Sequence, residues 1–402
     1  MTATAISDLV ARLRAGDTRA LARAISLVEN DAPEAPALLS ACFPHTGRAL
    51  RIGVTGAPGA GKSTLVDRLA RAFRDAGKSV GVVAVDPTSP FTGGAILGDR
   101  IRFREHQTGV PGESARHSDP GFYLRSMATR GSLGGLALAT ADVALVLEAS
   151  GKDVLLIETV GVGQDEIEIA RLADITLVIL VPGMGDDVQS LKAGVMEIAD
   201  IFVINKSDRD GADRVEQEIR GLQSLAPATR SPARFELEDH ERDSASLPGR
   251  HSTRHPQTAF GSEHDSTGAL HAQTAFVSGH DFSRAEMAPG EKGALAPEAV
   301  PTPPVIRTVA TTGDGLPALT SAIAALEQWL RDDKRLAARR TAHWQRRLDA
   351  MLRTELMRRA RQNGFDAKVL QFHAARIASG QQDPWQLVAQ LTEKVFNPEK
   401  SG

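Results

Sequence analysis

Short apolar segments alternate with longer amphipathic ones between residues 49 and 226, and this alternation predicts a mainly parallel α/β sheet. The apolar segments are β-branched and hydrophobic on both faces, as is typical of strands that helices cover on two sides. The expected strands are Ala49–Thr55, Ser79–Val85, Val154–Ile157, Ile175–Val181 and Ile201–Ile204, with a last one at Pro304–Ala310. Helices are expected to begin near Ser63, Leu133, Asp165, Asp187 and Ala212.

Helical patterns flank this α/β segment on both sides. Apolar stripes at Ile6–Leu13 and Leu21–Val28 predict a helical extension over residues 1–48. After a helix at Leu316–Leu330, the stretch Arg331–Arg361 reads as one long charged helix, and shorter helices are expected at Ala367–Ile377 and Pro384–Val395. We therefore divide the chain into an extension (1–48), an α/β domain (49–227 with 304–330) and a C-terminal helical region (331–402).

Residues 228–303 differ in character from the rest of the chain. They are rich in His, Ser, Thr, Gly, Pro and Ala, show no sustained period, and repeat His255–Asp265 imperfectly at His271–Asp281. We interpret the segment as a disordered insertion, because its histidines lack the close spacing of metal ligands. A metal-binding tract is the alternative reading.

Composition narrows the classes of partner and compartment. The 402 residues carry a net charge of -3, which argues against nucleic acid or an acidic membrane as the main partner. The single cysteine, Cys42, fits a reducing cytoplasm. We expect no membrane span, because no apolar run approaches the roughly 20 residues that one requires, and we see no signal-peptide pattern at the start.

The first chemical motif lies between the first expected strand and its helix. It reads Gly56-Ala57-Pro58-Gly59-Ala60-Gly61-Lys62-Ser63-Thr64, which is a complete phosphate-binding loop pattern. The glycines allow backbone N–H groups to surround phosphate oxygens at the positive end of a helix. Lys62 is expected to reach the β- and γ-phosphates, and the Ser63 hydroxyl to bind Mg²⁺.

A second motif indicates which base is bound. Asn205-Lys206-Ser207-Asp208 ends an apolar strand, and in a phosphate-loop protein this pattern suggests guanine. The Asp208 carboxylate is able to accept hydrogen bonds from the ring N1–H and the exocyclic amine, a donor pair that adenine lacks. The Lys206 stem is expected to lie over the base, and Ala310, at the end of the last strand, to support it from the other side.

Carboxylates at strand ends predict the metal side of the site. Glu158 ends one strand and Asp86 another, so both are expected at the carboxyl edge of the sheet. Asp99 lies in a glycine-rich segment, and three carboxylates fit one Mg²⁺ only if some act through water. The segments 87–99 and 160–165 have the glycines of loops that respond to a γ-phosphate. Within the second segment, Gly161 is expected to meet that phosphate, and Gln164 to orient the attacking water.

Several runs together resemble the MeaB/ArgK family of GTPases, over roughly Leu9–Pro227 and Pro304–Arg361. They are Asp86–Arg100, Arg125–Ala137, Glu158–Gln164, Val181–Asp186, Asn205–Asp208 and Thr308–Gly315. The resemblance implies a GTP- and Mg²⁺-dependent chaperone that docks on adenosylcobalamin-dependent methylmalonyl-CoA mutase and gates loading and repair of its cofactor. It also implies homodimers formed through C-terminal helices, here Arg331–Arg361.

The resemblance also implies roles for individual residues. By position, the catalytic set is Lys62, Asp99 and Gln164; the nucleotide set is Gly56–Thr64, Gly161, Asn205, Lys206, Asp208, Val309, Ala310 and Thr311; and the metal set is Ser63, Asp86, Asp99 and Glu158. The sequence departs from the family pattern at Val309, where many members have serine. The insertion 228–303 is a second departure from the family pattern. Glu158 departs only from phosphate-loop proteins in general, in which aspartate is the commoner acid at this place.

Two other functions compete with this reading. The histidine tract suggests a nickel-delivery GTPase of related fold, although the lone Cys42 speaks against its usual Cys/His cluster. A transporter-linked ATPase or kinase is the third candidate, and Asn205–Asp208 disfavours ATP. Within the favoured reading, methylmalonyl-CoA mutase and a related acyl-CoA mutase remain equally open as the partner.

Overall fold

The computed structural model describes residues 1–86, 119, 121–128, 135–159, 172–183, 195–225, 302–362 and 367–396. The expected insertion 228–303 lies outside these ranges except for its last two residues, and so do the two expected response loops with Asp99, Gly161 and Gln164. No helix among the described residues is long and apolar enough to cross a membrane.

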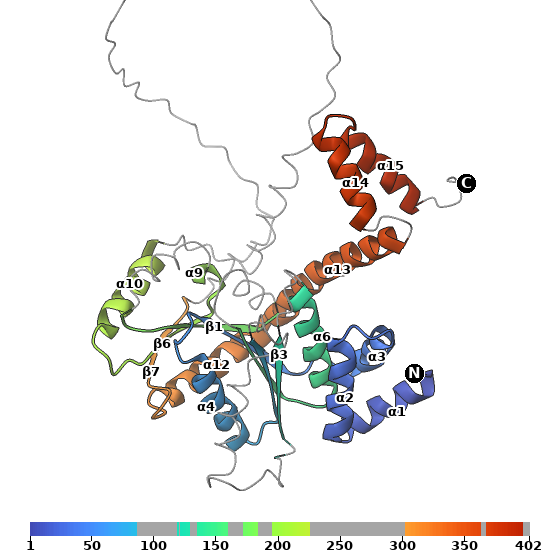
Figure 1. The fold of residues 1–402 in the computed structure, drawn as a ribbon. Helices are drawn as coiled ribbons and strands as arrows, with labels where there is room; N and C mark the ends of the chain where they lie inside the picture. The colour runs from blue at the N-terminus through green and yellow to red at the C-terminus, as the bar shows by residue number, and fades with distance from the viewer. Residues whose placement is uncertain are drawn as a thin grey trace, which may run out of the picture. The chain divides into compact units, whose positions relative to one another are not determined.

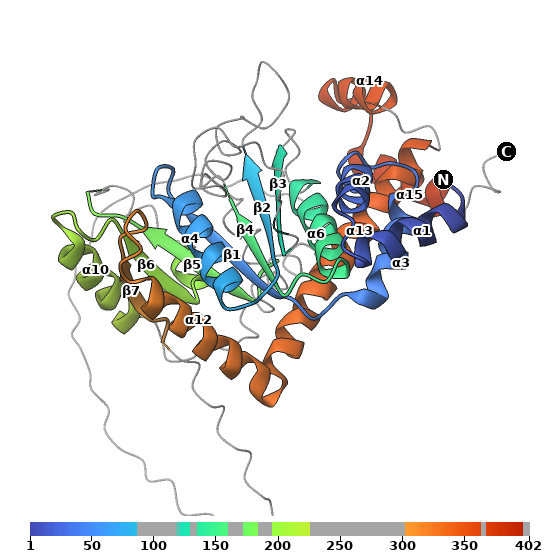
Figure 2. The ribbon, with the colours of Figure 1, turned by 90° about the horizontal axis from the view of Figure 1, so that it is seen from below.

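Within the described residues the chain forms a seven-stranded sheet in the order β3-β2-β4-β1-β5-β6-β7, shown in Figures 1 and 2. Every strand pair is parallel, which confirms the predicted α/β class. The strands are β1 (Leu50–Gly56), β2 (Val80–Asp86), β3 (Phe122–Ala128), β4 (Val154–Glu158), β5 (Ile175–Leu180), β6 (Ile201–Asn205) and β7 (Val305–Thr308).

Strand β3 is the one element of the sheet that the sequence pattern missed. It pairs with β2 in register from Val80↔Phe122 to Asp86↔Ala128. Its sequence, Phe-Tyr-Leu-Arg-Ser-Met-Ala, has no β-branched residue and is partly polar. As an edge strand it is covered less completely, so it lacks the continuous apolar run of the central strands.

Alternate residues of the strands enter two separate hydrophobic layers, as the two-residue period of a strand requires. On one face, Ile52, Val54 and Leu156 pack with α4 (Lys62–Asp75) and α12 (Leu316–Arg331). On the other face, Leu155 and Ile157 pack with α6 (Gly135–Ala149) and the N-terminal helices. Further along that face, α9 (Val195–Ile198) and α10 (Ala212–Leu225) pack on β5 and β6.

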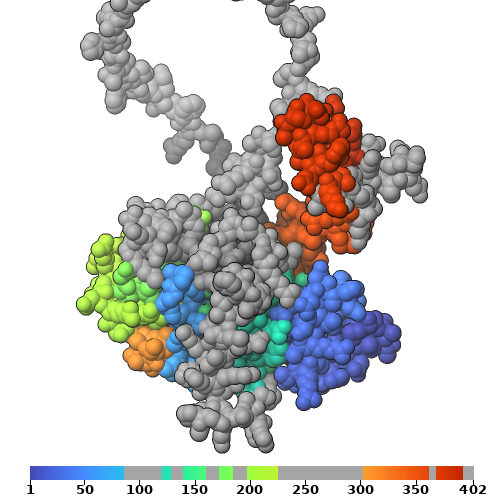
Figure 3. All heavy atoms as spheres, viewed as in Figure 1, coloured from blue at the N-terminus to red at the C-terminus, as the bar shows by residue number. Residues whose placement is uncertain are grey.

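The N-terminal extension forms α1 (Ala3–Arg14), α2 (Thr18–Glu29) and α3 (Ala35–Cys42), as expected for a helical prefix. Asp17 caps α2 by accepting from Arg19 N at 2.9 Å and Ala20 N at 3.1 Å. The predicted stripes are buried against α6, and Figure 3 shows the blue N-terminal atoms beside the green ones. An ion pair between Glu29 and Arg125 joins α2 to β3, so Arg125 stabilises the packing of the N-terminal helices against the sheet.

The C-terminal region consists of α13 (Arg335–Gln362), α14 (Ala367–Ala378) and α15 (Pro384–Phe396). A short 3₁₀ turn, Asp332–Lys334, separates α12 from α13, and Asp333 has a φ of 48° there. We expected one helix from Arg331 to Arg361, but the left-handed backbone at Asp333 ends α12 and starts α13 in a new direction.

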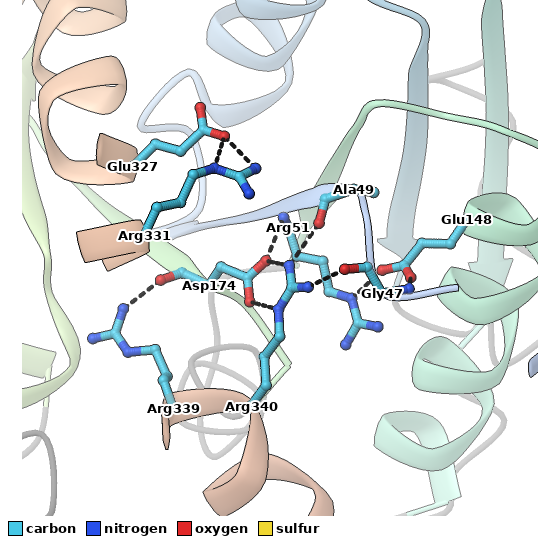
Figure 4. A network of polar contacts seen from close by, with 9 residues as sticks. All are labelled: Gly47, Ala49, Arg51, Glu148, Asp174, Glu327, Arg331, Arg339 and Arg340. Atoms are coloured by element: carbon cyan, nitrogen blue, oxygen red, sulfur yellow. Dashed lines mark hydrogen bonds and ion pairs between the residues drawn. The ribbon is translucent and has the colours of Figure 1, made fainter. Parts of the chain in front are cut away.

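Two arginines of α13 bind the amino ends of the central strands (Figure 4). Arg340 donates to both carboxylate oxygens of Asp174, from Nε at 2.9 Å and from Nη2 at 2.6 Å. Its Nη2 also donates to Ala49 O at 2.7 Å, and its Nη1 donates to Gly47 O at 2.5 Å. Arg339 contacts both oxygens of Asp200 at 2.7 and 3.1 Å. Asp174 precedes β5 and Asp200 precedes β6, so α13 is fixed to the edge of the sheet where its strands begin.

The same network continues to α6 through Arg51. The Arg51 guanidinium donates to Glu148 at 2.6 Å, its backbone N–H donates to Asp174 at 3.0 Å, and the other Glu148 oxygen accepts from Gly47 N at 2.6 Å. Asp174 is 0% exposed and Glu148 is 4% exposed. Buried carboxylates are tolerated only when charge and hydrogen bonds compensate them, so these residues act as one unit.

We predict that Arg340→Ala lowers the free energy of unfolding by about 3–5 kcal/mol, because it leaves the carboxylate of Asp174 buried without its counter-charge. Urea denaturation measures the change. Arg331→Ala is the matched control, since Arg331 pairs with Glu327 on an exposed face of α12 at 2.6 Å and should cost less than about 1 kcal/mol. Equal losses in the two variants would contradict the prediction.

A buried histidine on α13 predicts a pH effect. Burial, reinforced by the charge of Arg346, lowers the pKa of His343 to about 3, against the opposing charge of Asp174. Between that value and its ordinary 6.5, the unfolded chain binds a proton that the folded chain does not, so stability falls as pH falls. The free energy of unfolding of the parent protein should therefore fall between pH 7 and pH 5, and we expect His343→Gln to make that fall about 2 kcal/mol smaller. Denaturation profiles of the two proteins that stay parallel with pH would show that His343 does not titrate this way.

Candidate functional site

The loop between β1 and α4 has the backbone conformation that its glycines allow. Gly56, Gly59 and Gly61 have φ values of 139°, 76° and 90°, in the range that residues with a Cβ rarely adopt. A Cβ at Gly56 would lie 2.2 Å from Ile179 O, and one at Gly61 would lie 2.4 Å from Asn205 Nδ2. Residues of β5 and β6 therefore lie directly against this loop, and neither Gly56 nor Gly61 leaves room for a side chain.

The side chain of Lys62 points back to the beginning of the phosphate loop. Its Nζ donates to Gly56 O at 2.8 Å and to Ala57 O at 3.0 Å, and the residue is 6% exposed. Gly61 is the N-cap residue of α4, and no side chain caps the helix there. The first N–H groups of α4 therefore have no side-chain cap next to the ammonium of Lys62, and an uncapped helix N-terminus of this kind is suited to bind an anion.

The structure brings together two of the expected metal-side residues. The Ser63 hydroxyl donates to Glu158 Oε1 at 2.6 Å, and Glu158 is 5% exposed at the end of β4. Two hard oxygen atoms at this separation suit Mg²⁺, which prefers such ligands. Asp86 ends the neighbouring β2, two positions beyond the Ala84↔Glu158 register pair. Asp99, the third expected carboxylate, lies outside the described residues.

Asn205 connects the two loops that the sequence motifs assigned to phosphate and base. Its Nδ2 donates to Ala60 O at 2.7 Å, while its Oδ1 accepts from Ala310 N at 3.0 Å and from the Thr308 hydroxyl at 3.3 Å. The side chain is 2% exposed. Through these three bonds Asn205 holds the phosphate loop and the loop after β7 side by side.

Lys206 and Asp208 follow at the end of β6. Lys206 has a φ of 55°, and its Nζ donates to Gly59 O at 2.7 Å, so the stem spans the gap to the phosphate loop. Ser207 donates to Thr308 O from both its backbone N–H and its hydroxyl, each at 3.1 Å. Asp208 is exposed just beyond these anchors, where its carboxylate is accessible to a ligand.

The loop after β7 contains Val309, Ala310 and Thr311, which we expected to lie near the base. Strand β7 is shorter than predicted because Val309 turns back and bonds to Asp314 O at 3.0 Å. Gly315 closes this turn at a φ of 76°, and a Cβ there would lie 1.9 Å from Arg307 O. Ala310 is 5% exposed, whereas Thr311 is exposed, so the loop presents its second half to solvent.

One residue of this site was not found from the sequence. Arg68, on α4, donates from Nε to Ala310 O at 3.1 Å and from Nη2 to Thr311 O. It lies 242 positions from Ala310 in the chain, so no motif spacing relates the two. The only signal in the sequence is an arginine on the helix that follows the phosphate loop, and such residues are usually solvated.

Comparisons with known proteins agree with this architecture. A solved structure titled LAO/AO transport system kinase matches over 99% of both chains, with a TM-score of 0.57 and 22% identity, which shows the shared fold. A protein of Pyrococcus abyssi named as a GTPase is 56% identical over 214 residues, or 53% of this chain and 63% of its own length. GTPase ArgK of Escherichia coli is 42% identical over 214 residues, or 52% of this chain and 62% of its own length.

The aligned segment thus covers less than two thirds of the length of each of these two relatives. A family model matches a far larger share of the chain, from residue 21 to residue 364, and it is described as methylmalonyl Co-A mutase-associated GTPase MeaB. That range includes the phosphate loop, the Asn205–Asp208 motif, the loop after β7 and α13. The chain therefore belongs to the MeaB family of methylmalonyl-CoA mutase-associated GTPases.

Proposed function

We propose that this protein binds GTP with Mg²⁺, hydrolyses it to GDP and phosphate, and uses the cycle to gate cofactor loading and repair of an adenosylcobalamin-dependent acyl-CoA mutase. The observation that carries the nucleotide part is the Asn205 bridge. It holds the phosphate loop at Ala60 and the loop after β7 at Ala310 with one side chain, at 2.7 and 3.0 Å. A phosphate site and a base site are then adjacent.

The phosphate half rests on Lys62 and the amino end of α4. Both are positive and face into the loop, so they stabilise the charge that accumulates on the β- and γ-phosphate oxygens. Ser63 and Glu158 would hold Mg²⁺ from the other side, and the bound ion neutralises further phosphate charge. Asp86 and Asp99 complete this metal set in our proposal, with Gly161 and Gln164 acting near the γ-phosphate and the attacking water.

The base half rests on Asp208, Lys206 and the loop after β7. Asp208 is exposed and its backbone is fixed by the Ser207–Thr308 contacts, so its carboxylate can accept the two donors on the Watson–Crick edge of guanine. The Lys206 stem, held at Gly59 O, offers an apolar surface for the purine ring. Val309, Ala310 and Thr311 close the pocket from the opposite side.

We also propose a homodimer that forms through the C-terminal helices. Large apolar side chains of the second half of α13 are 39–61% exposed, namely Leu348, Met351, Leu352, Leu356 and Met357. Trp385 and Val388 on α15 are 83% and 59% exposed. Single exposed apolar residues are common on monomeric proteins, whereas several such side chains together usually mark an interface. A second copy of the chain would cover them.

The mutase role has a direct test. We expect the protein to form a complex with apo methylmalonyl-CoA mutase in the presence of a non-hydrolysable GTP analogue, and the mutase to raise the rate of GTP hydrolysis at least several-fold. Analytical ultracentrifugation and phosphate release measure the two effects. A related acyl-CoA mutase serves as a parallel arm, because either enzyme fits the proposal. If neither mutase binds nor changes the rate, the chaperone part of the proposal fails while GTP hydrolysis stands.

Guanine recognition is tested at Asp208. We expect Asp208→Asn to weaken GDP binding about 100-fold and to improve xanthosine diphosphate binding, because xanthine presents an acceptor where guanine presents its exocyclic amine. Calorimetric titration with both nucleotides gives the affinities. Asp210→Asn is the control, since Asp210 is another exposed aspartate two residues further on. Unchanged GDP affinity in the Asp208 variant would remove this carboxylate from the base pocket.

A further inference from the structure

Arg68 holds one particular peptide group in the loop after β7. Its Nε donates to Ala310 O at 3.1 Å, and its Nη2 donates to the next carbonyl, Thr311 O. One planar guanidinium thus binds two consecutive carbonyl groups, which a lysine ammonium cannot match in geometry. Because α4 begins at the phosphate loop, the residue links the phosphate-binding helix to this second loop.

The consequence for the loop follows from peptide geometry. The C=O of Ala310 and the N–H of Thr311 belong to the same peptide group, and in a planar trans peptide they point in opposite directions. Arg68 draws the carbonyl toward α4, so the Thr311 N–H points away from α4. The preceding N–H, that of Ala310, is bound to Asn205 Oδ1 at 3.0 Å. Arg68 therefore holds the peptide 310–311 by its carbonyl, and both neighbouring peptides are anchored as well, the preceding one by Asn205 and the following one by Arg68.

The Thr311 N–H also differs from its neighbours in its hydrogen bonding. Around it, Val309 N donates to Asp314 O, and both Thr312 N and Gly313 N donate to Val309 O. Within the part of the chain that the structure describes, the N–H of Thr311 donates to no protein group, and the residue is exposed. The loop thus presents one backbone donor in a fixed direction beside the phosphate loop.

We propose that Arg68 is a positioning residue that makes the site selective for 6-oxopurines, a role that rests on the guanine pocket proposed above. A fixed N–H donor pairs with the 6-oxo group of guanine or hypoxanthine. Adenine has an amine at this position, which is itself a donor, so it gains nothing from the contact. Arg68 acts through the 310–311 peptide and does not touch the nucleotide.

The test compares Arg68→Ala, Arg68→Lys and the parent protein in calorimetric titrations with GDP, IDP and ADP. We expect Arg68→Ala to weaken GDP and IDP about 10-fold each, because both bases carry the 6-oxo group, and to leave ADP within about 2-fold. The KM for GTP should rise by the same factor as the Kd for GDP, with little change in kcat. Arg68→Lys should fall between the other two, because one ammonium replaces the guanidinium fork.

Two controls separate this role from general damage. Arg214→Ala removes an exposed arginine that pairs with Glu218 on α10 at 2.9 Å, and it should change none of the affinities. A purely structural role of Arg68 would lower the melting temperature and weaken GDP and ADP by the same factor, which would overturn the proposal, as would unchanged GDP binding. If the alanine variant does not fold, the GDP-to-ADP ratio of Arg68→Lys decides in the same way.

Asp208→Asn, measured in the same series, distinguishes a failure of the proposed role of Arg68 from a failure of the proposed base pocket. If it alters guanine selectivity and Arg68→Ala does not, only the role of Arg68 is wrong. If neither the parent protein nor Asp208→Asn shows guanine selectivity, the proposed base pocket itself fails.

Discussion

The parallel direction of every strand pair in the described sheet is the constraint on which the rest of the arrangement depends. It places all the strand beginnings at one edge and all the strand ends at the other. Polar residues at strand ends therefore meet, although they are far apart in sequence: Glu158, Asn205 and the residues after Thr308 lie at one edge. Residues before the strands, such as Asp174 and Asp200, meet at the opposite edge. The chain uses the first edge for the candidate site and the second to anchor α13.

The amino-end edge is held together by charge. Asp174 is 0% exposed, and its carboxylate is satisfied by Arg340 and by the N–H of Arg51. Burying this group is unfavourable unless those partners are in place, so folding of the sheet and docking of α13 are coupled. Arg340 binds Ala49 O just before β1, and β1 leads into the phosphate loop. Arg339 binds Asp200 just before β6, and β6 ends at Asn205. The C-terminal helix is thereby attached to the same strands that form the site.

The carboxyl-end edge is held together by amide, ammonium and guanidinium side chains. Asn205 joins the phosphate loop to the loop after β7, Lys206 adds a contact to Gly59 O, and Arg68 reaches Ala310 O from α4. Each of these contacts crosses between segments that no short motif connects. Their common effect is to fix loop backbones in advance, so that less ordering remains when a ligand binds. This is the physical basis on which a rigid base pocket is proposed beside a phosphate loop.

The sequence by itself determined the fold class, the positions along the chain of six of the seven strands and the phosphate loop, because these depend on local periodicity and on glycine positions such as Gly56 and Gly61. It also placed Ser63 with Glu158, since both follow strands of one parallel sheet. It missed β3, whose partly polar edge pattern carries no strong signal. Only the tertiary structure decided the roles of Arg340 and Arg68, because their partners lie on distant segments. Charged helix residues look alike in sequence, and what distinguishes them is the buried carboxylate or the loop carbonyl that the fold brings within reach.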